Sequence, residues 1–214
     1  MNSSPSHYFS PVATDWLDHD NAAHAAGERS VVVRAGGWKL EMRSGAGTFA
    51  RDGLDAGSQL LVESFLEEFK TTSGVRLCDL GCGWGPVGCL LAKAFPDTSV
   101  FGCDINARAV FLARDNARRL LLPNAHFWCG DGLKSARPQL FDAILSNPPV
   151  RAGNAVIQSL FDDAFQTLQL NGQLWIVLRT AQGAKSWHKR LNAQFSNCRM
   201  IALQSGYRVL RCRR

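Results

Sequence analysis

A glycine-rich turn flanked by two carboxylates is the part of this sequence whose residue types most directly suggest ligand chemistry. The turn, Gly81-Cys82-Gly83-Trp84-Gly85, follows an apolar segment and precedes a helix that we expect to begin near Pro86. Glycines let a backbone turn sharply and approach a ligand where a Cβ atom would collide. Asp79 stands just before the turn. Asp104 ends the next apolar segment, where a carboxylate can accept both ribose hydroxyls of an adenosine.

Asn147-Pro148-Pro149 is the second segment with chemical potential. The Asn147 side-chain oxygen and the Pro148 carbonyl can accept the two N–H protons of an exocyclic amine, which would aim the nitrogen lone pair at an electrophile. The prolines fix φ and add no competing backbone donor. A plain turn after the apolar segment 141–146 is the alternative. The position of this segment after the glycine turn and Asp131 favours the catalytic interpretation of Asn147, Pro148 and Pro149.

Two nucleoside cofactors fit the glycine turn. Residues 83–88 match the GxGxxG pattern of NAD-binding proteins. Asp79 disfavours that choice, because a pyrophosphate approaching a helix N-terminus prefers no negative charge nearby. S-adenosylmethionine has no phosphate and carries a cationic sulfonium and ammonium, so an acidic neighbour is helpful. A hydride-transfer site also has no need of Asn-Pro-Pro, and we therefore predict S-adenosylmethionine.

Taken together, these segments resemble the class I S-adenosylmethionine-dependent methyltransferases. More narrowly, they are similar to the "methyltransferase small domain" group, which includes bacterial guanine-N2 methyltransferases of 16S ribosomal RNA. The resemblance extends over nearly the whole chain, because flanking segments also match at residues 7–10, 47–49, 54–58 and 206–210. It implies that Asp131 touches adenine N6 and that Ile105 lies against the adenine face. The residues that it assigns to the cofactor are Asp79, Gly81, Cys82, Gly83, Gly85, Asp104, Ile105, Asn106, Asp131, Gly132 and Asn147.

The chain departs from this group directly after the second proline. The group usually places an aromatic residue there, which can stack on a flipped-out base, but this chain has Val150 followed by Arg151. Valine cannot supply the roughly 1–3 kcal/mol of base–aromatic stacking. Either Phe49, Trp84 or another aromatic residue replaces it, or the acceptor is not a stacked base. We place Phe49, Val150 and Arg151 on the substrate side.

The order of apolar segments predicts an α/β fold, a doubly wound, mostly parallel seven-stranded sheet of the Rossmann-like methyltransferase type with the last strand antiparallel. The expected strands are 75–80, 99–104, 125–128, 142–146, 173–179, 198–203 and 206–212. Helices are expected from about Ser58, after Asn106, and over 155–170 with Gly172 just past the end. An N-terminal β-hairpin extension pairs 31–33 with 38–42, burying Trp38, Leu40 and Met42. Residues 1–30 are expected to form a flexible or loosely docked arm before a single domain at 31–214.

Charge separates the two parts of the chain. Residues 1–150 have 14 Lys and Arg against 16 Asp and Glu, whereas residues 151–214 have 10 against 2. Such asymmetry favours a polyanionic partner, and with the resemblance it predicts RNA, ribosomal RNA first, as substrate. An ordinary solvated surface is the alternative. The candidate phosphate contacts are Arg151, Arg179, Lys185, Lys189, Arg190 and Arg208.

Other compositional signals point to a cytoplasmic protein without membrane or metal partners. No stretch approaches the roughly 20 apolar residues that span a bilayer, and the first 30 residues do not read as a secretory signal. The seven cysteines contain no CxxC pair, so we expect buried thiols instead of zinc ligands or disulfides. The five histidines have no metal-ligand spacing, and the sequence does not predict an oligomeric state.

The sequence therefore predicts an S-adenosylmethionine-dependent N-methyltransferase, with guanine N2 of RNA as the first candidate acceptor. A protein glutamine side-chain amide has the same donor geometry, but enzymes of that type usually show tyrosine after Asn-Pro-Pro. Small-molecule methylation is a further option. An alternative of another class is a catalytically silent RNA-binding protein that retains the cofactor fold.

Overall fold

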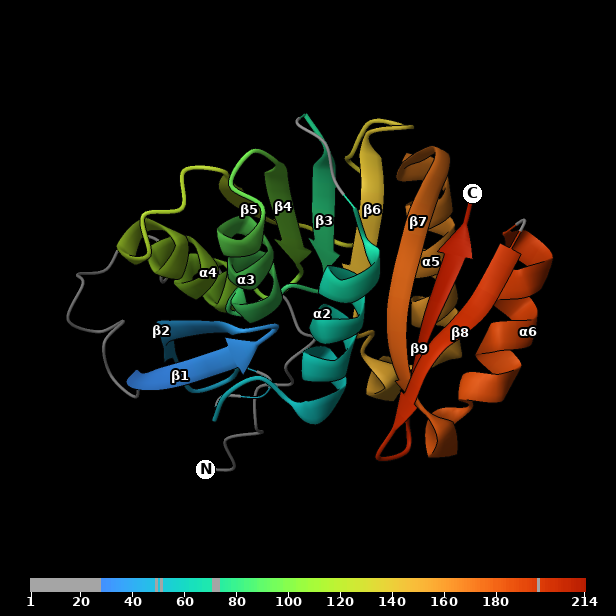
Figure 1. Ribbon diagram of the computed structural model, residues 1–214, viewed down its shortest axis with the longest axis horizontal. Coiled ribbons are helices and arrows are strands. Elements are labelled where there is room, and N and C mark those ends of the chain that lie inside the picture. Colours follow the sequence, from blue (N-terminus) through green and yellow to red (C-terminus); the bar gives the residue numbers. More distant parts are fainter. Residues whose placement is uncertain (1–27, 49, 51, 71–73, 196) are drawn as a thin grey trace, which may run out of the picture.

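The computed structural model describes residues 28–48, 50, 52–70, 74–195 and 197–214, and a seven-stranded sheet forms its centre (Figure 1). The strand order is β5-β4-β3-β6-β7-β9-β8, and β9, the last strand of the chain, runs antiparallel to both neighbours. The expected fold class is therefore confirmed. The strands are β3 (Arg76–Leu80), β4 (Ser99–Asp104), β5 (Ala125–Cys129), β6 (Phe141–Ser146), β7 (Leu168–Arg179), β8 (Asn197–Gln204) and β9 (Tyr207–Arg213).

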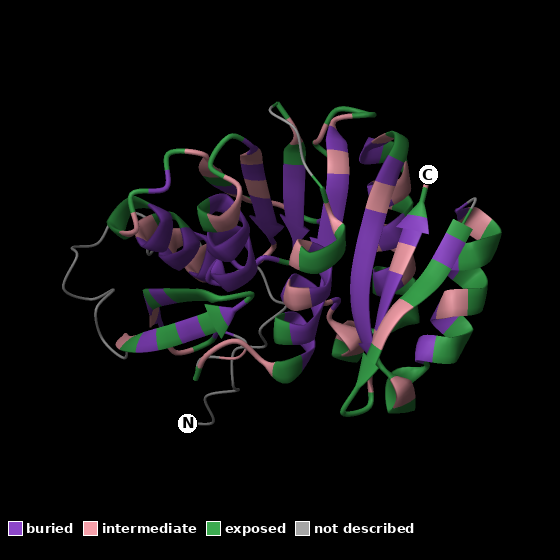
Figure 2. Cartoon of the chain, viewed as in Figure 1, coloured by how far each residue is buried: buried purple, intermediate pink, exposed green. Residues whose placement is uncertain are grey.

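Helices cover both faces of this sheet (Figure 1). They are α2 (Ala56–Glu68), α3 (Pro86–Ala94), α4 (Ala107–Arg119), α5 (Asn154–Thr167) and α6 (Ala184–Gln194), with short 3-10 turns η2 (Val150–Ala152) and η3 (Thr180–Gln182). Side chains alternate along β7, so Trp175 packs with α2, α3 and α4 while Leu174 and Ile176 pack with α5 and α6. The central strands are buried along most of their length (Figure 2), as a parallel sheet with two covered faces requires.

The N-terminal extension is a hairpin of β1 (Arg29–Ala35) and β2 (Trp38–Ser44). Its turn, Gly36-Gly37, has φ values of 57° and 81°, the pattern of a two-residue hairpin turn that glycine accommodates without strain. Leu40 and Met42 join the core beneath α2, α3 and α4, whereas Trp38 at the hairpin tip is 37% exposed, contrary to our expectation.

The helix expected over 155–170 ends earlier, at Thr167. Leu168 has extended backbone angles and pairs with Phe141 of β6, so sheet pairing overrides the helical spacing of the leucines. Gly172 consequently lies inside β7 instead of behind a helix. A Cβ atom there would sit 2.8 Å from the Gln169 carbonyl oxygen, so the tight backbone requires glycine.

The cysteines also differ from expectation at one pair, because Cys198 and Cys212 form a disulfide. Gln204 pairs with Tyr207 at the turn, and continuing that register would place Cys198 opposite Arg213. A bulge between Met200 and Ala202 shifts the ladder by one residue and brings the two cysteines face to face. The other five cysteines are free, and four of them are buried as expected.

Candidate cofactor and acceptor site

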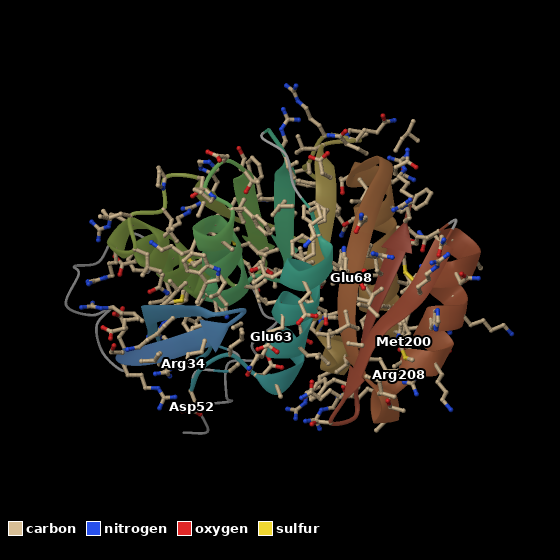
Figure 3. The ribbon with its side chains drawn as sticks, viewed as in Figure 1. Arg34, Asp52, Glu63, Glu68, Met200 and Arg208 are labelled. Atoms are coloured by element: carbon tan, nitrogen blue, oxygen red, sulfur yellow. A yellow bond between two sulfur atoms is a disulfide. The ribbon has the colours of Figure 1, made fainter. Side chains whose placement is uncertain are left out.

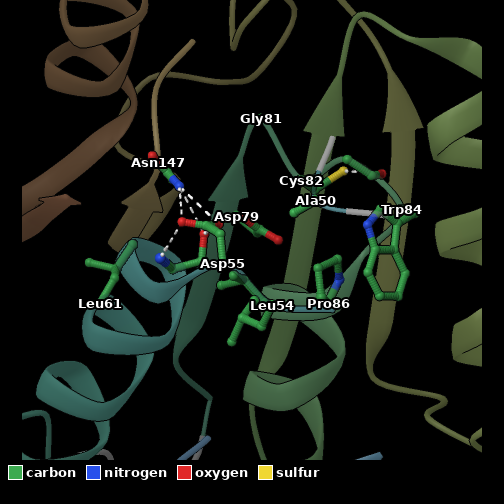
Figure 4. Close-up of a pocket in the computed structure, with 13 residues that line it drawn as sticks. Ala50, Leu54, Asp55, Leu61, Asp79, Gly81, Cys82, Trp84, Pro86 and Asn147 are labelled. Atoms are coloured by element: carbon green, nitrogen blue, oxygen red, sulfur yellow. Dashed lines mark hydrogen bonds between the residues drawn. The ribbon is translucent and has the colours of Figure 1, made fainter. Parts of the chain in front are cut away.

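One cleft opens at the carboxyl ends of β3 and β6, where the chain order of the sheet reverses direction (Figure 4). Such switch points are the usual ligand positions in open α/β sheets. The described walls of the cleft are Ala50, Leu54, Asp55, Ser58, Leu61, Asp79, Gly81, Cys82, Gly83, Trp84, Pro86, Val87 and Asn147.

The glycine turn between β3 and α3 is held against β4 by its own backbone. The N–H groups of Gly81 and Cys82 both donate to the Cys103 carbonyl, at 2.8 and 3.0 Å. Gly85 precedes Pro86, the first residue of α3, with a φ of 88°, and a Cβ atom there would lie 2.9 Å from Ala113 Cβ. The local sequence therefore places the turn close over the strand ends, as expected from its glycines.

Asp79 is buried beneath the start of α3 with 4% exposure. Its Oδ2 accepts the Gly88 N–H at 2.9 Å. Burial raises the pKa of Asp79 to about 7; the Gly88 hydrogen bond opposes this rise, and the neighbouring charge of Asp104 adds to it. A buried carboxylate with a raised pKa lining a cleft is stabilised by a cationic ligand, and such groups often mark functional sites.

Asp104 lies at the end of β4 and fixes two loops at once. Its Oδ2 accepts the Gly83 N–H at 2.9 Å, and its Oδ1 accepts the Asn106 N–H at 2.8 Å. Asn106 in turn caps α4 by accepting the Ala109 N–H at 3.1 Å, and its side chain donates to the Gly47 carbonyl. Asn106 thus has a structural task in the described residues, next to the position that the sequence predicts for the ribose.

Asp131 and Gly132 follow β5 and lie beside the β4 end, because the Gly130 N–H donates to the Asp104 carbonyl at 3.0 Å. Asp131 is exposed and forms an ion pair with Lys134. Neither residue is among the cleft walls, and the same is true of Gly85, Asp104, Ile105 and Asn106. The fold therefore arranges these predicted cofactor residues along one edge of the sheet, next to the cleft that holds the glycine turn.

Asn147 enters the cleft from the end of β6, and its amide group is anchored by the start of α2. Its Nδ2 donates to Ser58 Oγ at 2.9 Å and lies 3.3 Å from both oxygens of Asp55. Its side-chain oxygen points away from Asp55 (Figure 4), and no donor to that oxygen occurs among the residues that the model describes.

Asp55 and Ser58 belong to the site but were not predicted as site residues. The available signal was local: Asp55 is the N-cap of α2, where its Oδ1 accepts the N–H groups of Gly57 and Ser58 at 3.0 and 3.2 Å. An aspartate just before an apolar helical pattern predicts a helix N-cap. It does not predict a contact with a residue 92 positions later.

The residues that follow Asn147 lie outside the described walls of the cleft. Pro148 is buried, and its carbonyl accepts the Val150 N–H at 2.9 Å. Val150 packs against the core beneath α5 and α6, whereas Arg151 is exposed. Pro148, Pro149, Val150 and Arg151 are not among the described cleft walls. Val150 thus has a packing role at the position where the group that the chain resembles usually has an aromatic residue.

Of the aromatic substitutes considered, Trp84 lines the cleft, but its side chain is 1% exposed and lies at the opposite end from Asn147 (Figure 4). A buried indole cannot stack on an incoming base, so Trp84 covers the glycine-turn end instead. Phe49 falls outside the described residues. Asn116 supports Trp84 from below, donating to its backbone carbonyl at 3.0 Å and to that of Arg43 in β2 at 2.9 Å.

A doubly wound sheet with a glycine turn, a strand-end aspartate and a cleft at the switch point defines the class I S-adenosylmethionine-dependent methyltransferases. A family model described as "Methyltransferase small domain" matches residues 39–211. The chain belongs to this family, which confirms the resemblance, the class of enzyme and the cofactor inferred from the sequence motifs.

The chain also has similar relatives, two of which are named as ribosomal RNA methyltransferases. The chain is 35% identical over 185 residues to the uncharacterized protein YbxB of Bacillus subtilis, covering 83% of this chain and 90% of that one. It is 34% identical over 180 residues to ribosomal RNA large subunit methyltransferase G of Alcanivorax borkumensis, covering 82% of this chain and 44% of the relative. For ribosomal RNA small subunit methyltransferase C of Stutzerimonas stutzeri the identity is 32% over 179 residues, with coverages of 80% and 50%. The chain thus spans about half the length of these two enzymes.

Among solved structures, the fold resembles the T. thermophilus 16S rRNA N2 G1207 methyltransferase (RsmC) in complex with AdoMet and guanosine. The TM-score is 0.78 at 23% identity, covering 87% of this chain and 50% of that chain. In the described part of the chain, no helix is long and apolar enough to cross a membrane. Likewise, the described residues contain no group of three or more His, Cys, Asp or Glu side chains that could hold a metal ion.

Proposed function

We propose that this protein transfers a methyl group to the exocyclic N2 amine of a guanine in ribosomal RNA. One observation carries the proposal: the Asn147 amide is anchored through its nitrogen, so its oxygen is presented at the same cleft as the glycine turn. The acceptor class is supported by relatives named as ribosomal RNA methyltransferases and by a similar fold solved with AdoMet and guanosine.

The residues of the cleft fit S-adenosylmethionine. This cofactor supplies a methyl group on a cationic sulfonium, with a neutral leaving group. Asp79, whose charged form is destabilised by burial, would be stabilised beside a cationic ligand. Asp104 and Asp131 are proposed for the ribose hydroxyls and the adenine. Asp104 ends β4 beside the glycine turn, since its Oδ2 accepts the Gly83 N–H.

The acceptor amine would be positioned by Asn147 and Pro148. The Asn147 oxygen accepts one N–H of the amine. The Pro148 carbonyl has a second lone pair besides the one bound to the Val150 N–H, and it accepts the other. This pair of acceptors leaves the nitrogen lone pair directed into the cleft. Most of the rate gain would come from positioning, because displacement of a methyl group from a sulfonium releases a neutral leaving group and needs no strong base.

NAD fits the same turn less well. A pyrophosphate at a helix N-terminus binds to free backbone N–H groups. Here the N–H of Gly83 donates to Asp104, and that of Gly88 donates to Asp79. Two donors that a pyrophosphate would use are thus already bound to carboxylates, which would repel it.

The basic C-terminal part supports RNA as the polyanionic partner. Arg151 is exposed after β6 and Arg179 is exposed at the carboxyl end of β7. Arg208 pairs with Leu178, next to Arg179, and donates to Thr180 Oγ1 at 3.1 Å. Lys185, Lys189 and Arg190 are exposed on α6. These side chains are the proposed phosphate contacts, with the base extruded into the cleft.

We further propose that residues 31–214 act as one domain and that the protein works in the cytoplasm, where ribosomal RNA is its substrate. Val31 and Val33 of the hairpin share a hydrophobic core with α2, α3 and α4, which supports the domain assignment. Residues 1–27 of the proposed arm lie outside the described part of the chain.

The test combines labelled S-adenosylmethionine with ribosomal RNA, a mixture of cellular proteins and a metabolite extract, assayed separately. We expect label in RNA, as N2-methylguanine after digestion. Asn147→Ala should reduce transfer by roughly 10²-fold or more while cofactor affinity stays within about twofold. Label that appears only in protein or only in small molecules would show that RNA is not the acceptor. An Asn147→Ala variant with full activity would contradict the proposed role of the amide.

A further inference from the structure

The Asn147 side chain has two orientations that differ only by exchange of its oxygen and nitrogen. Only the orientation with the oxygen directed away from Asp55 presents an acceptor to an amine; the other presents two N–H donors. The function of this amide therefore depends on what determines its orientation.

In every hydrogen bond described for the Asp55 side chain, the carboxylate is the acceptor. Ser58 Oγ donates its single proton to Asp55 Oδ2 at 2.6 Å, so towards Asn147 it can only accept. The two Asp55 oxygens are acceptors as well. Three oxygen acceptors consequently surround the Asn147 nitrogen, at 2.9, 3.3 and 3.3 Å. In the reversed orientation the Asn147 oxygen would face all three without a proton between them.

The backbone holds this arrangement in place. Asp55 Oδ1 accepts the N–H groups of Gly57 and Ser58 in the first turn of α2, which ties the carboxylate to the helix start. Tyr207 of β9 packs tightly on the same turn, since a Cβ atom on Gly57 would lie 2.7 Å from Tyr207 Cε1 and 3.1 Å from Asp55 Oδ1. The side chains of Asp55 and Ser58 therefore cannot retreat from Asn147 without moving the helix.

We infer that Asp55, acting through Ser58, is a positioning residue that sets the polarity of the Asn147 amide and thereby makes it an acceptor for the substrate amine. The inference rests on the proposed function for its catalytic consequence. The orientation itself is a property of the free protein. Asp55 need not touch the substrate for this role.

Asp55→Asn tests the inference because it replaces one oxygen acceptor by an N–H donor and leaves the shape of the side chain nearly unchanged. Asparagine caps helices as well as aspartate does, so α2 keeps its first-turn bonds. The new amide nitrogen takes the place of Oδ2, Ser58 then accepts from it and donates its proton towards Asn147, and the Asn147 oxygen turns inward. We expect kcat to fall roughly 10²-fold, with cofactor Kd within about twofold of the original.

Reversing both members should restore the site. Asn147→Asp alone places two carboxylates together and should also be poorly active. In the double variant Asp55→Asn with Asn147→Asp, the new amide at position 55 donates to one oxygen of the new carboxylate at position 147. The other oxygen of that carboxylate faces the cleft. We expect kcat about tenfold or more above either single variant, an interaction that independent structural damage would not produce. Glu63→Gln, farther along α2 and hydrogen-bonded to Gln59, is the matched control and should leave kcat unchanged (Figure 3).

A second measurement reports orientation without any acceptor. In an ¹⁵N-labelled protein, the Asn147 side-chain amide protons should exchange slowly with water, and they should exchange rapidly in Asp55→Asn. Unchanged exchange and undiminished kcat in folded Asp55→Asn would overturn the inference, as would a double variant no better than its parents. If the exchange result holds while the original protein labels no RNA, the proposed function fails and the orientation role of Asp55 stands.

Discussion

Replacing Asp79 by asparagine should stabilise the ligand-free protein at neutral and alkaline pH while weakening cofactor binding. The carboxylate is buried beneath α3, and its Oδ2 accepts the Gly88 N–H. Asparagine has nearly the same shape, and its oxygen can keep that bond while its NH2 group faces the cleft. The variant thus removes mainly the cost of holding a negative charge in a buried position.

The size of the effect follows from the pKa of Asp79, which burial raises from the usual 3.8 to about 7. Well below pH 3.8 the group is neutral in both folded and unfolded chains and contributes nothing. As pH rises from about 3.8 to about 7, Asp79 ionises in the unfolded chain but not in the folded chain, so the native state loses stability. Above about pH 7 the loss is constant. At about 1.4 kcal/mol per pKa unit the ceiling is roughly 4 kcal/mol, of which roughly 2–3 kcal/mol accrues between pH 5 and pH 8.

The assay is urea unfolding of the original protein and Asp79→Asn at pH 5 and pH 8, because other titrating groups cancel in the difference between the two proteins. The stability advantage of the variant should be larger at pH 8 than at pH 5, by the roughly 2–3 kcal/mol derived above. An advantage that is equal at both pH values, or that shrinks at pH 8, would refute the raised pKa and with it the preference of this position for a cationic ligand.

Three further predictions concern Asp79 and two buried positions near the glycine turn. Binding of S-adenosylmethionine at pH 7 should release about half a proton from Asp79, seen by calorimetry in buffers of different ionisation enthalpy, and Asp79→Asn should release none. Gly102→Ala places a Cβ atom 2.4 Å from Phe127 Cδ1, so the free energy of unfolding should fall by about 1–3 kcal/mol in urea. Asn116→Leu removes the buried bonds that join β2 to the Trp84 carbonyl, and we expect a loss of about 2–4 kcal/mol by the same method.

Much of the fold could be predicted because local pattern and tertiary structure agree. Strand bounds within the sheet lie close to those expected, except in β7, since alternating apolar segments and glycine turns repeat a βα order that few topologies satisfy. The exceptions have long-range causes. Leu168 pairs with Phe141, and the bulge near Met200 sets which residue faces Cys212. Neither event leaves a mark in the nearby sequence.

The site residues were predictable where the local sequence alone places them at the end of a strand. The glycine turn, Asp79 and Asn147 line one cleft because each follows or ends a strand whose carboxyl end lies at the same edge. The contact of Asp55 with Asn147 was not predictable, because the helix α2 that carries Asp55 returns over the sheet before the first central strand begins. Its N-cap role accounts for its residue type without any reference to the site.

The most direct test is a crystal structure of this protein with S-adenosylmethionine or a non-reactive analogue and guanosine. The account predicts the adenosine at the glycine turn, next to Asp104, and the guanine N2 nitrogen hydrogen-bonded to the Asn147 side-chain oxygen. The methyl-bearing sulfur should lie on the far side of that nitrogen from the oxygen, near the glycine turn. A cofactor bound outside this cleft, or an Asn147 oxygen turned towards Asp55 in the complex, would contradict it.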